Sequence, residues 1–172
     1  MELQLARLEP RDQERYLEYL REWADFGGEM VPNSCLMQGK SFDEFLLFLE
    51  LAQHEATVLP GKVPATLFIL VDEDRRIYGA LSLRHTLNDY LLQYGGNIGY
   101  GIRPSQRGHG YAKIMLQLGL AEAKRLGIKR ALITCDETNR ASAATILANG
   151  GVWETTVMRD QTAVERYWIT IL

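Results

Sequence analysis

The chain has 172 residues, of which 47% are hydrophobic and 24% are charged, and its formal net charge at pH 7 is −3. These are ordinary values for a soluble globular protein, so residues 1–172 are expected to form a single domain with a core of useful size. The mildly acidic balance gives no support to nucleic-acid binding, which requires a basic face.

Membrane, secretory and metal-binding signals are missing from the sequence. No stretch approaches the roughly 20 apolar residues of a membrane span, and the opening residues lack the basic and apolar character of a signal peptide. Cys35 and Cys135 match neither a metal site nor a disulfide framework. We therefore expect a cytoplasmic protein with reduced thiols, no metal and no membrane contact.

The first 60 residues predict a short strand and two helices. Residues 3–8 alternate as a strand, and a helix that begins at Pro10 is stopped by Gly27. Ser41 and Glu44 resemble a capping box, which opens a second helix. The aromatic residues of these helices are expected to lie in the core rather than in an acceptor box; they are Trp23, Phe26, Phe42 and Phe45.

The middle of the chain changes to a strand pattern. Residues 67–71 and 77–83 predict an antiparallel hairpin with a charged turn. A strand over 98–103, a helix over 111–126 and a strand over 129–135 follow. A strand, helix and strand in this order form a unit whose two strands should be parallel.

The end of the chain predicts a second hairpin, over 152–158 and 166–171, and residues 88–96 predict a turn with a short apolar piece. We find no repeat, linker or low-complexity tract. The sum is an α/β (α+β) domain with a mixed, largely antiparallel sheet of six or seven strands.

The most informative stretch runs from Ile102 to Ala112, where an apolar strand leads through a basic turn with two glycines into a helix. The amino terminus of that helix points into the turn, where unpaired backbone N–H groups and the positive end of the macrodipole favour an anion. The helix is expected to bury one apolar face, made of Ile114, Met115, Leu118 and Ala121.

Two familiar phosphate-binding loops do not fit this turn. A nucleoside triphosphatase loop needs Gly-Lys followed by Ser or Thr, and the residues of this turn contain no such run. A dinucleotide-binding loop needs a third glycine where Lys113 stands, and it follows the first strand of its domain.

The turn resembles the Arg/Gln-x-x-Gly-x-Gly/Ala signature of the GNAT N-acetyltransferase superfamily, whose loop holds the pyrophosphate of acetyl-CoA. The matching residues are Arg107, Gly108, His109, Gly110, Tyr111 and Ala112. The likeness covers residues 66–158 and includes a following strand, Asn139, Ser142 and Gly150. The runs 99–104 and 149–151 are similar to a subgroup of uncharacterised predicted acetyltransferases, from which no substrate carries over.

The resemblance implies a fold and a set of contacts with acetyl-CoA as co-substrate. Helices cover both faces of the sheet, and two central parallel strands splay apart to admit the CoA arm. The backbone around Tyr100 aligns the acetyl and pantetheine groups, and the amides of residues 107–112 hold the pyrophosphate. The other implied contacts are Gly101, Ile102, Asn139 and Ser142.

The sequence departs from the family at the residue that often stands near the CoA sulfur. Many members have a tyrosine at the position of Ile146, which has no proton to donate. The candidate acids are then Tyr100, Tyr167 or a water. The candidate bases are Asp136, Glu137, His85 and, through water, Glu29.

The sequence therefore predicts an N-acetyltransferase in which a primary amine attacks acetyl-CoA directly in a ternary complex. A small-molecule amine is favoured over a protein as the acceptor. One alternative is a non-catalytic acyl-CoA-binding or sensor module, and another is an interaction domain with a chance glycine loop. The loops 25–40 and 84–96 are expected to bind the acceptor, and their charges favour no single class. A homodimer is the oligomer that the resemblance suggests, with Tyr167 and Trp168 as either contact or core.

Overall fold

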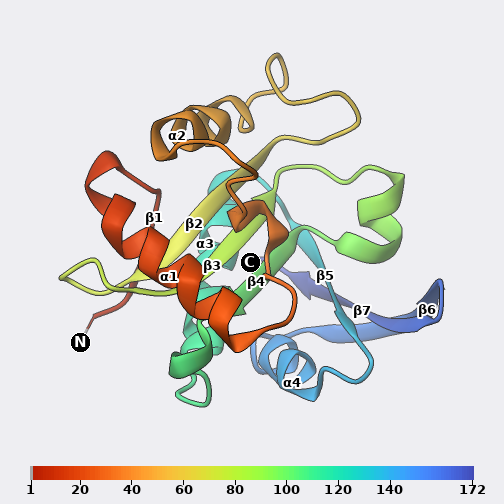
Figure 1. Cartoon of the computed structure of the whole chain (residues 1–172). Helices are drawn as coiled ribbons and strands as arrows, with labels where there is room; N and C mark the ends of the chain where they lie inside the picture. The colour runs from red at the N-terminus through yellow and green to blue at the C-terminus, as the bar shows by residue number, and fades with distance from the viewer. Residues whose placement is uncertain (1) are drawn as a thin grey trace.

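The computed structural model describes residues 2–172, and its elements confirm the predicted order (Figure 1). The strands are β1 (Gln4–Ala6), β2 (Ala65–Val71), β3 (Ile77–Arg84), β4 (Ile98–Ile102), β5 (Arg130–Asp136), β6 (Val152–Arg159) and β7 (Thr162–Thr170). The α-helices are α1 (Gln13–Phe26), α2 (Phe42–Leu51), α3 (Tyr111–Arg125) and α4 (Arg140–Ala148), and a π-helical turn, η3, spans Leu91–Gly95.

The strands form two ladders, β1-β2-β3-β4 and β5-β7-β6, in which every paired strand is antiparallel. The ladders meet at one point, where the Asn97 N–H donates to the Leu132 carbonyl over 2.7 Å and the Leu132 N–H donates to Asn97 Oδ1 over 2.9 Å. Beyond it β4 and β5 continue in the same direction, with Tyr100 still near Cys135, but no longer pair. The predicted fold class with a splayed central pair is confirmed.

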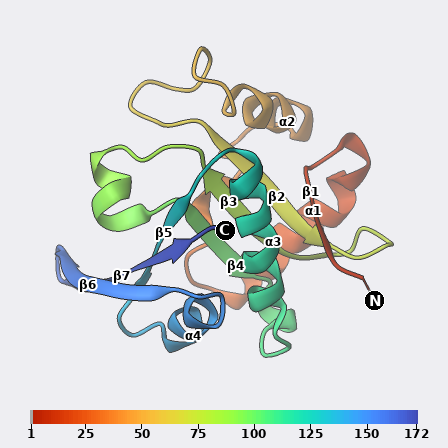
Figure 2. The same cartoon turned by 180° about the vertical axis from the view of Figure 1, so that it is seen from behind.

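Helices cover both faces of the first ladder. In Figure 1, α1 and α2 lie in front of the strands, and Figure 2 shows α3 on the opposite face. The core accordingly has two parts: one includes Tyr16 and Phe45 beneath α1 and α2, and the other includes Leu81, Met115 and Ile146 beneath α3 and α4. Each large apolar side chain buried in this way stabilises the fold by about 1.5–3 kcal/mol.

Local sequence signals set the ends of α1 and α2. Ser41 Oγ accepts from the Glu44 N–H, and the Glu44 carboxylate accepts from the Ser41 N–H, which is the predicted capping box. Gly27, with φ of +78°, ends α1 as predicted. At the start of α1, the fully buried Asp12 accepts two hydrogen bonds from Arg75, at 2.6 and 2.5 Å, which fasten the helix to the β2–β3 turn.

The predicted face of α3 is wrong by about one position. Ile114 is 39% exposed and Ala121 is exposed. A Cβ at Gly119 would lie 2.5 Å from Leu81 Cδ1, so this glycine lets the helix approach β3 closely and sets which face is covered. The buried residues of α3 are Met115, Leu116, Gly119 and Ala123.

Three other expectations change in the structure. Phe26 is 60% exposed, whereas the three other aromatic residues expected in the core are buried. Tyr167 is 4% exposed and belongs to the core, so it does not offer a contact surface. Strand β7 begins at Thr162 rather than at residue 166, because Arg159 pairs directly with Thr162 across a tight turn. Among the described residues, no helix combines the length and apolar character needed to cross a membrane.

Candidate active site

The loop before α3 is held in place by an ion-pair cluster that begins where β4 ends. Arg103 is 3% exposed, and its guanidinium donates to Glu22, to Glu18 and to the Ile77 carbonyl. Glu22 also accepts from the backbone N–H of Ser105 over 2.7 Å. Burial opposes the ionisation of Glu22, but the hydrogen bonds from Ser105 and Arg103 lower its pKa. The cluster therefore ties the loop to α1.

The loop itself presents open backbone. Gly108 and Gly110 have φ of +80° and +78°, and a Cβ at either position would meet nothing within 4 Å. Glycine is required here because the backbone is left-handed, and not because a side chain would be crowded. Gly110 is the N-cap residue of α3 and no side chain caps the helix, which leaves its first amide groups directed at open space. An anion can occupy that space.

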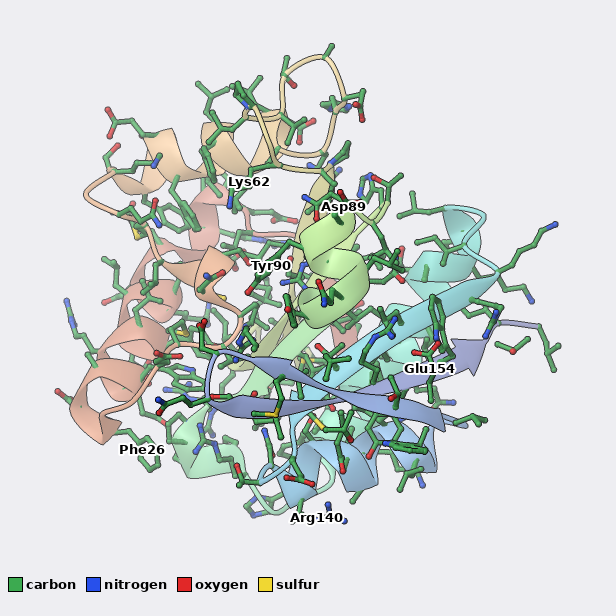
Figure 3. The ribbon with its side chains drawn as sticks, turned by 90° about the vertical axis from the view of Figure 1, so that its right-hand side faces the viewer. Phe26, Lys62, Asp89, Tyr90, Arg140 and Glu154 are labelled. Atoms are coloured by element: carbon green, nitrogen blue, oxygen red, sulfur yellow. The ribbon has the colours of Figure 1, made fainter. Side chains whose placement is uncertain are left out.

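Arg107 is exposed at this loop and already has partners within the chain. Its Nε donates to the Ile102 carbonyl over 3.2 Å. Its guanidinium lies 4.7 Å from the Phe26 ring centroid and 5.0 Å from that of Trp23. Figure 3 shows Phe26 projecting at the end of α1. Arg107 is therefore a surface cation kept beside the loop by two aromatic rings, which explains why Phe26 is exposed.

The aromatic residues around Gly110 stack on one another, although His109 is exposed. His109 stacks on Tyr111 with ring centroids 5.6 Å apart, and Tyr111 meets Tyr78 edge-on at 5.1 Å. Ala112 is half-buried at the start of α3. These side chains order the segment whose amides face the open space.

The gap between β4 and β5 gathers three of the predicted residues. Tyr100 points from β4 toward α4, where its hydroxyl lies 2.9 Å from Ser142 Oγ. Asn139 caps α4, since its Oδ1 accepts from the Ser142 N–H over 3.1 Å. Cys135 lies in the same gap, and burial raises its pKa to about 11, so it is a protonated thiol at neutral pH. Burial likewise raises the pKa of Tyr100 to about 12.

The two acidic candidates lie at the end of β5 and away from Tyr100. Asp136 is half-exposed and pairs with Arg159 at 3.4 Å. Glu137 is exposed, and its backbone N–H donates to the Ala163 carbonyl. Within residues 2–172, no hydrogen bond or ion pair joins Tyr100, Asp136 and Glu137 to one another. The structure thus places these candidates around the gap without linking them.

The other acid and base candidates have different surroundings. Tyr167 donates to Glu165 over 2.5 Å, and burial with this partner raises its pKa. His85 Nε2 lies 2.8 Å from Thr66 Oγ1, and burial together with the nearby His54 lowers the pKa of His85. Glu29 is exposed on the loop that follows α1. Ile146 is fully buried, so its position is filled by core rather than by a polar group.

The face of β4 turned toward α1 has a feature that sequence reasoning missed. Gly99 and Gly101 lie on this face, and a Cβ at Gly101 would collide with the Val31 carbonyl. Over Gly99 lies the guanidinium of Arg84, with Nη1 and Nη2 each 3.2 Å from the position a Cβ would take. The alternation of glycines in β4 was the available signal. It does not reveal which side chain fills the space.

Two surface hollows of the described chain do not include residues 107–112. One, of about 230 Å³, is lined by α3 and the last residues of the chain, and the other, of about 250 Å³, lies beside Arg103. The loop before α3 offers open backbone at the surface rather than an enclosed cavity. We therefore place the site by the loop and β4.

Comparison with known proteins agrees with this geometry. A family model described as an acetyltransferase (GNAT) domain matches residues 2–152. No curated protein matches the chain significantly.

Solved structures have the same fold. A chimera of the spermidine N-acetyltransferase SpeG from Vibrio cholerae and hSSAT is 17% identical, with a TM-score of 0.66 over 99% of this chain and 96% of that one. A dodecameric spermidine N-acetyltransferase from Vibrio cholerae is 18% identical, with a TM-score of 0.67 over 98% and 93% of the two chains. The structure of yncA from Salmonella typhimurium, solved with its cofactor acetyl-CoA, is 13% identical, with a TM-score of 0.64 over 98% and 94%.

Proposed function

The chain belongs to the GNAT acetyltransferase family, whose co-substrate is acetyl-CoA, and we propose that it acetylates a primary amine of a small molecule. The observation that carries the proposal is the open backbone before α3, where the positions of Gly108 and Gly110 are uncrowded and no side chain caps the first amides of the helix. The family model covers this loop and both strands of the splayed pair.

The described residues fit acetyl-CoA in two further respects. Among the described residues, β4 pairs only with β3, so its second edge offers the backbone groups of Tyr100 and the N–H of Ile102 to an extended ligand; the Ile102 carbonyl already accepts from Arg107. The gap beyond that edge is bordered by Ser142, with Asn139 beside it. Residues 107–112 would hold the pyrophosphate, with Arg107 adding a positive charge next to it.

The chemistry divides between the ligand and the chain. Acetyl-CoA, when bound, supplies an activated thioester to the acceptor nitrogen. The protein orders the reactants, and alignment of this kind accounts for much of the rate gain in such reactions. Burial raises the pKa of Cys135 to about 11, and no histidine is among the described groups that act on it, which supports direct transfer rather than an acyl-cysteine.

We assign the proton for the leaving thiolate to Tyr100, whose hydroxyl is protonated at neutral pH and stands in the gap. Asp136 and Glu137 stay the predicted bases, acting on the amine through water. Tyr100→Phe should lower kcat by about 100-fold while acetyl-CoA still binds. An unchanged kcat would instead assign the proton to a water.

The proposal is tested by isothermal titration of acetyl-CoA into the wild-type protein and into Gly110→Trp. Gly127→Trp is the matched control, because Gly127 ends the same helix, has the same φ of +78° and is equally uncrowded. We expect micromolar binding in the wild type and the control, and none in Gly110→Trp. Absence of binding in the wild type, or equal binding in all three proteins, would overturn the proposal.

Turnover separates the enzyme from a sensor module. Release of free thiol from acetyl-CoA in the presence of a panel of primary amines is expected for an acetyltransferase. Binding without release for every amine would favour the non-catalytic alternative.

A further inference from the structure

Arg84 is a half-buried cation that has no acidic partner among the described residues. Its guanidinium Nη1 donates to the carbonyls of Gly95 and Gly96, at 3.2 and 3.4 Å. Burial lowers its pKa, and the charge interaction that acts on it comes from Tyr90 rather than from a carboxylate. A half-buried cation is stabilised by a counter-charge, and residues 2–172 supply none at Arg84.

The unused side of the guanidinium has the shape for one kind of ligand. Within residues 2–172, Nε and Nη2 of Arg84 donate to no acceptor. Neither atom is buried, so both can reach a ligand from solvent. These two N–H groups lie side by side on one edge of the planar group. Such an edge binds the two oxygens of a carboxylate with two parallel hydrogen bonds.

The place of Arg84 relates this edge to the proposed site. The guanidinium lies flat over Gly99, and Gly101 is on the same face of β4, about 6.6 Å farther along the strand. The proposed function assigns the backbone around Gly101 to the acetyl end of acetyl-CoA. The Val31 carbonyl closes the face of Gly101 itself, so a small acceptor would bring its amine to the acetyl group at the edge of β4 and a second group to Arg84.

The surroundings of Arg84 include one further cation, Lys62, and one acid, Asp89. Asn88 donates to the Gly61 carbonyl over 3.3 Å, which joins the 84–96 segment to the α2–β2 connection and brings exposed Lys62 beside it. Figure 3 shows Lys62, Asp89 and Tyr90 on the same flank, next to η3. Asp89 forms no ion pair with either cation in the described chain.

We propose that Arg84 binds the carboxylate of the acceptor, and that the acceptor is a small amino acid-like amine rather than a polyamine. This inference rests on the proposed function and deepens it. Arg84 acts on affinity and orientation; it takes no part in proton transfer. The nitrogen of the acceptor forms the new amide bond with the acetyl carbon, the bond from that carbon to sulfur breaks, and the proton lost by nitrogen is balanced by the one gained by the thiolate.

The test compares acceptors that differ only in the carboxylate. The twenty amino acids are assayed beside their carboxamides and beside a polyamine, with the wild type, Arg84→Gln, Arg84→Lys and the control Arg21→Gln. Arg21 is an exposed residue of α1, so its replacement removes one positive charge away from the site. Thiol release gives kcat and KM, and titration of acetyl-CoA is run on each protein.

We expect the wild type and Arg21→Gln to prefer the best amino acid to its carboxamide by about 10- to 100-fold in kcat/KM, mainly through KM. Arg84→Gln should lose this preference and keep its affinity for acetyl-CoA. Arg84→Lys should recover part of the preference. Equal use of carboxamides, better use of the polyamine, or a preference that survives in Arg84→Gln would overturn the inference.

Failure of the proposed function looks different, because it would remove acetyl-CoA binding or all thiol release from the wild type. In that case the amino acids and their carboxamides are titrated directly into the protein. Binding that needs both the carboxylate and Arg84 would uphold the carboxylate site, and its absence would overturn it.

Discussion

Two guanidinium groups lie against β4, one near each end of the strand, and they are partnered differently. After the carboxyl end, every nitrogen of Arg103 has an acceptor, from Glu22, Glu18 or the Ile77 carbonyl. Near the amino end, Arg84 uses only Nη1, on two carbonyls. Removing the acid from a buried ion pair leaves an uncompensated charge, whereas Arg84 has no acid to lose among the described residues. The hydrogen bonds of Arg103 therefore indicate a structural residue, and the open N–H groups of Arg84 indicate a residue that is available to a ligand.

The largest effect is expected where a fully paired guanidinium loses its acid. Arg75 resembles Arg103 in this respect, with Asp12 as its completely buried partner. Asp12→Ala should lower the free energy of unfolding by about 3–5 kcal/mol, because it leaves an uncompensated buried charge. Denaturant unfolding measures the change, and a loss below about 1 kcal/mol would contradict the importance of this pair.

The same pair gives a pH dependence of known sign. Burial opposes ionisation of Asp12, but the hydrogen bonds from Arg75 and the Glu9 backbone outweigh it and lower the pKa below 3.8. A carboxylate with a depressed pKa adds stability above its unfolded-state value and loses it as the pH falls through its folded-state value. The stability gap between the wild type and Asp12→Asn should therefore narrow below pH 3.8. A gap that stays constant from pH 5 to pH 2 would refute the coupling.

Replacing Glu22 is expected to have an intermediate effect on the free energy of unfolding. It is one of two acids at Arg103 and also accepts from the Ser105 N–H. Glu22→Gln should cost about 1.5–3 kcal/mol of stability, the range for hydrogen bonds to charged groups. Since it loosens the loop before α3, it should also weaken acetyl-CoA binding. Arg21→Gln is the control, and it should change neither the free energy of unfolding nor the affinity for acetyl-CoA.

The smallest effect on stability should come from Arg84. Arg84→Met removes a cation that has no acid to leave behind, so the free energy of unfolding should change by less than about 1 kcal/mol or rise. Thermal unfolding checks this. A loss as large as that of Asp12→Ala would mean that Arg84 is a structural residue like Arg103.

The sequence predicted those parts of the fold that depend on local signals. The capping box of Ser41 and Glu44 and the stop at Gly27 involve residues within one turn of each other, and both appear as expected. The run 107–112 was recognised for the same reason, since its glycines and the helix after them are adjacent in the chain.

The parts that escaped prediction depend on contacts between distant segments. Arg107 contacts Phe26, which lies far from it in the sequence, and the guanidinium of Arg84 lies over Gly99 on the neighbouring strand. The covered face of α3 follows from the approach of Gly119 to Leu81. A periodicity or a motif describes one segment at a time. Contacts between segments that are far apart in the sequence become visible only in the folded structure.

The most direct test of the account is amide hydrogen exchange of the protein with and without acetyl-CoA. The amides at the start of α3 and along the free edge of β4 are uncapped or unpaired in the structure, and we expect acetyl-CoA to slow their exchange. Exchange in β6 should not change. Slowing confined to segments other than residues 98–113, or no slowing at all, would contradict the placement of acetyl-CoA at this loop.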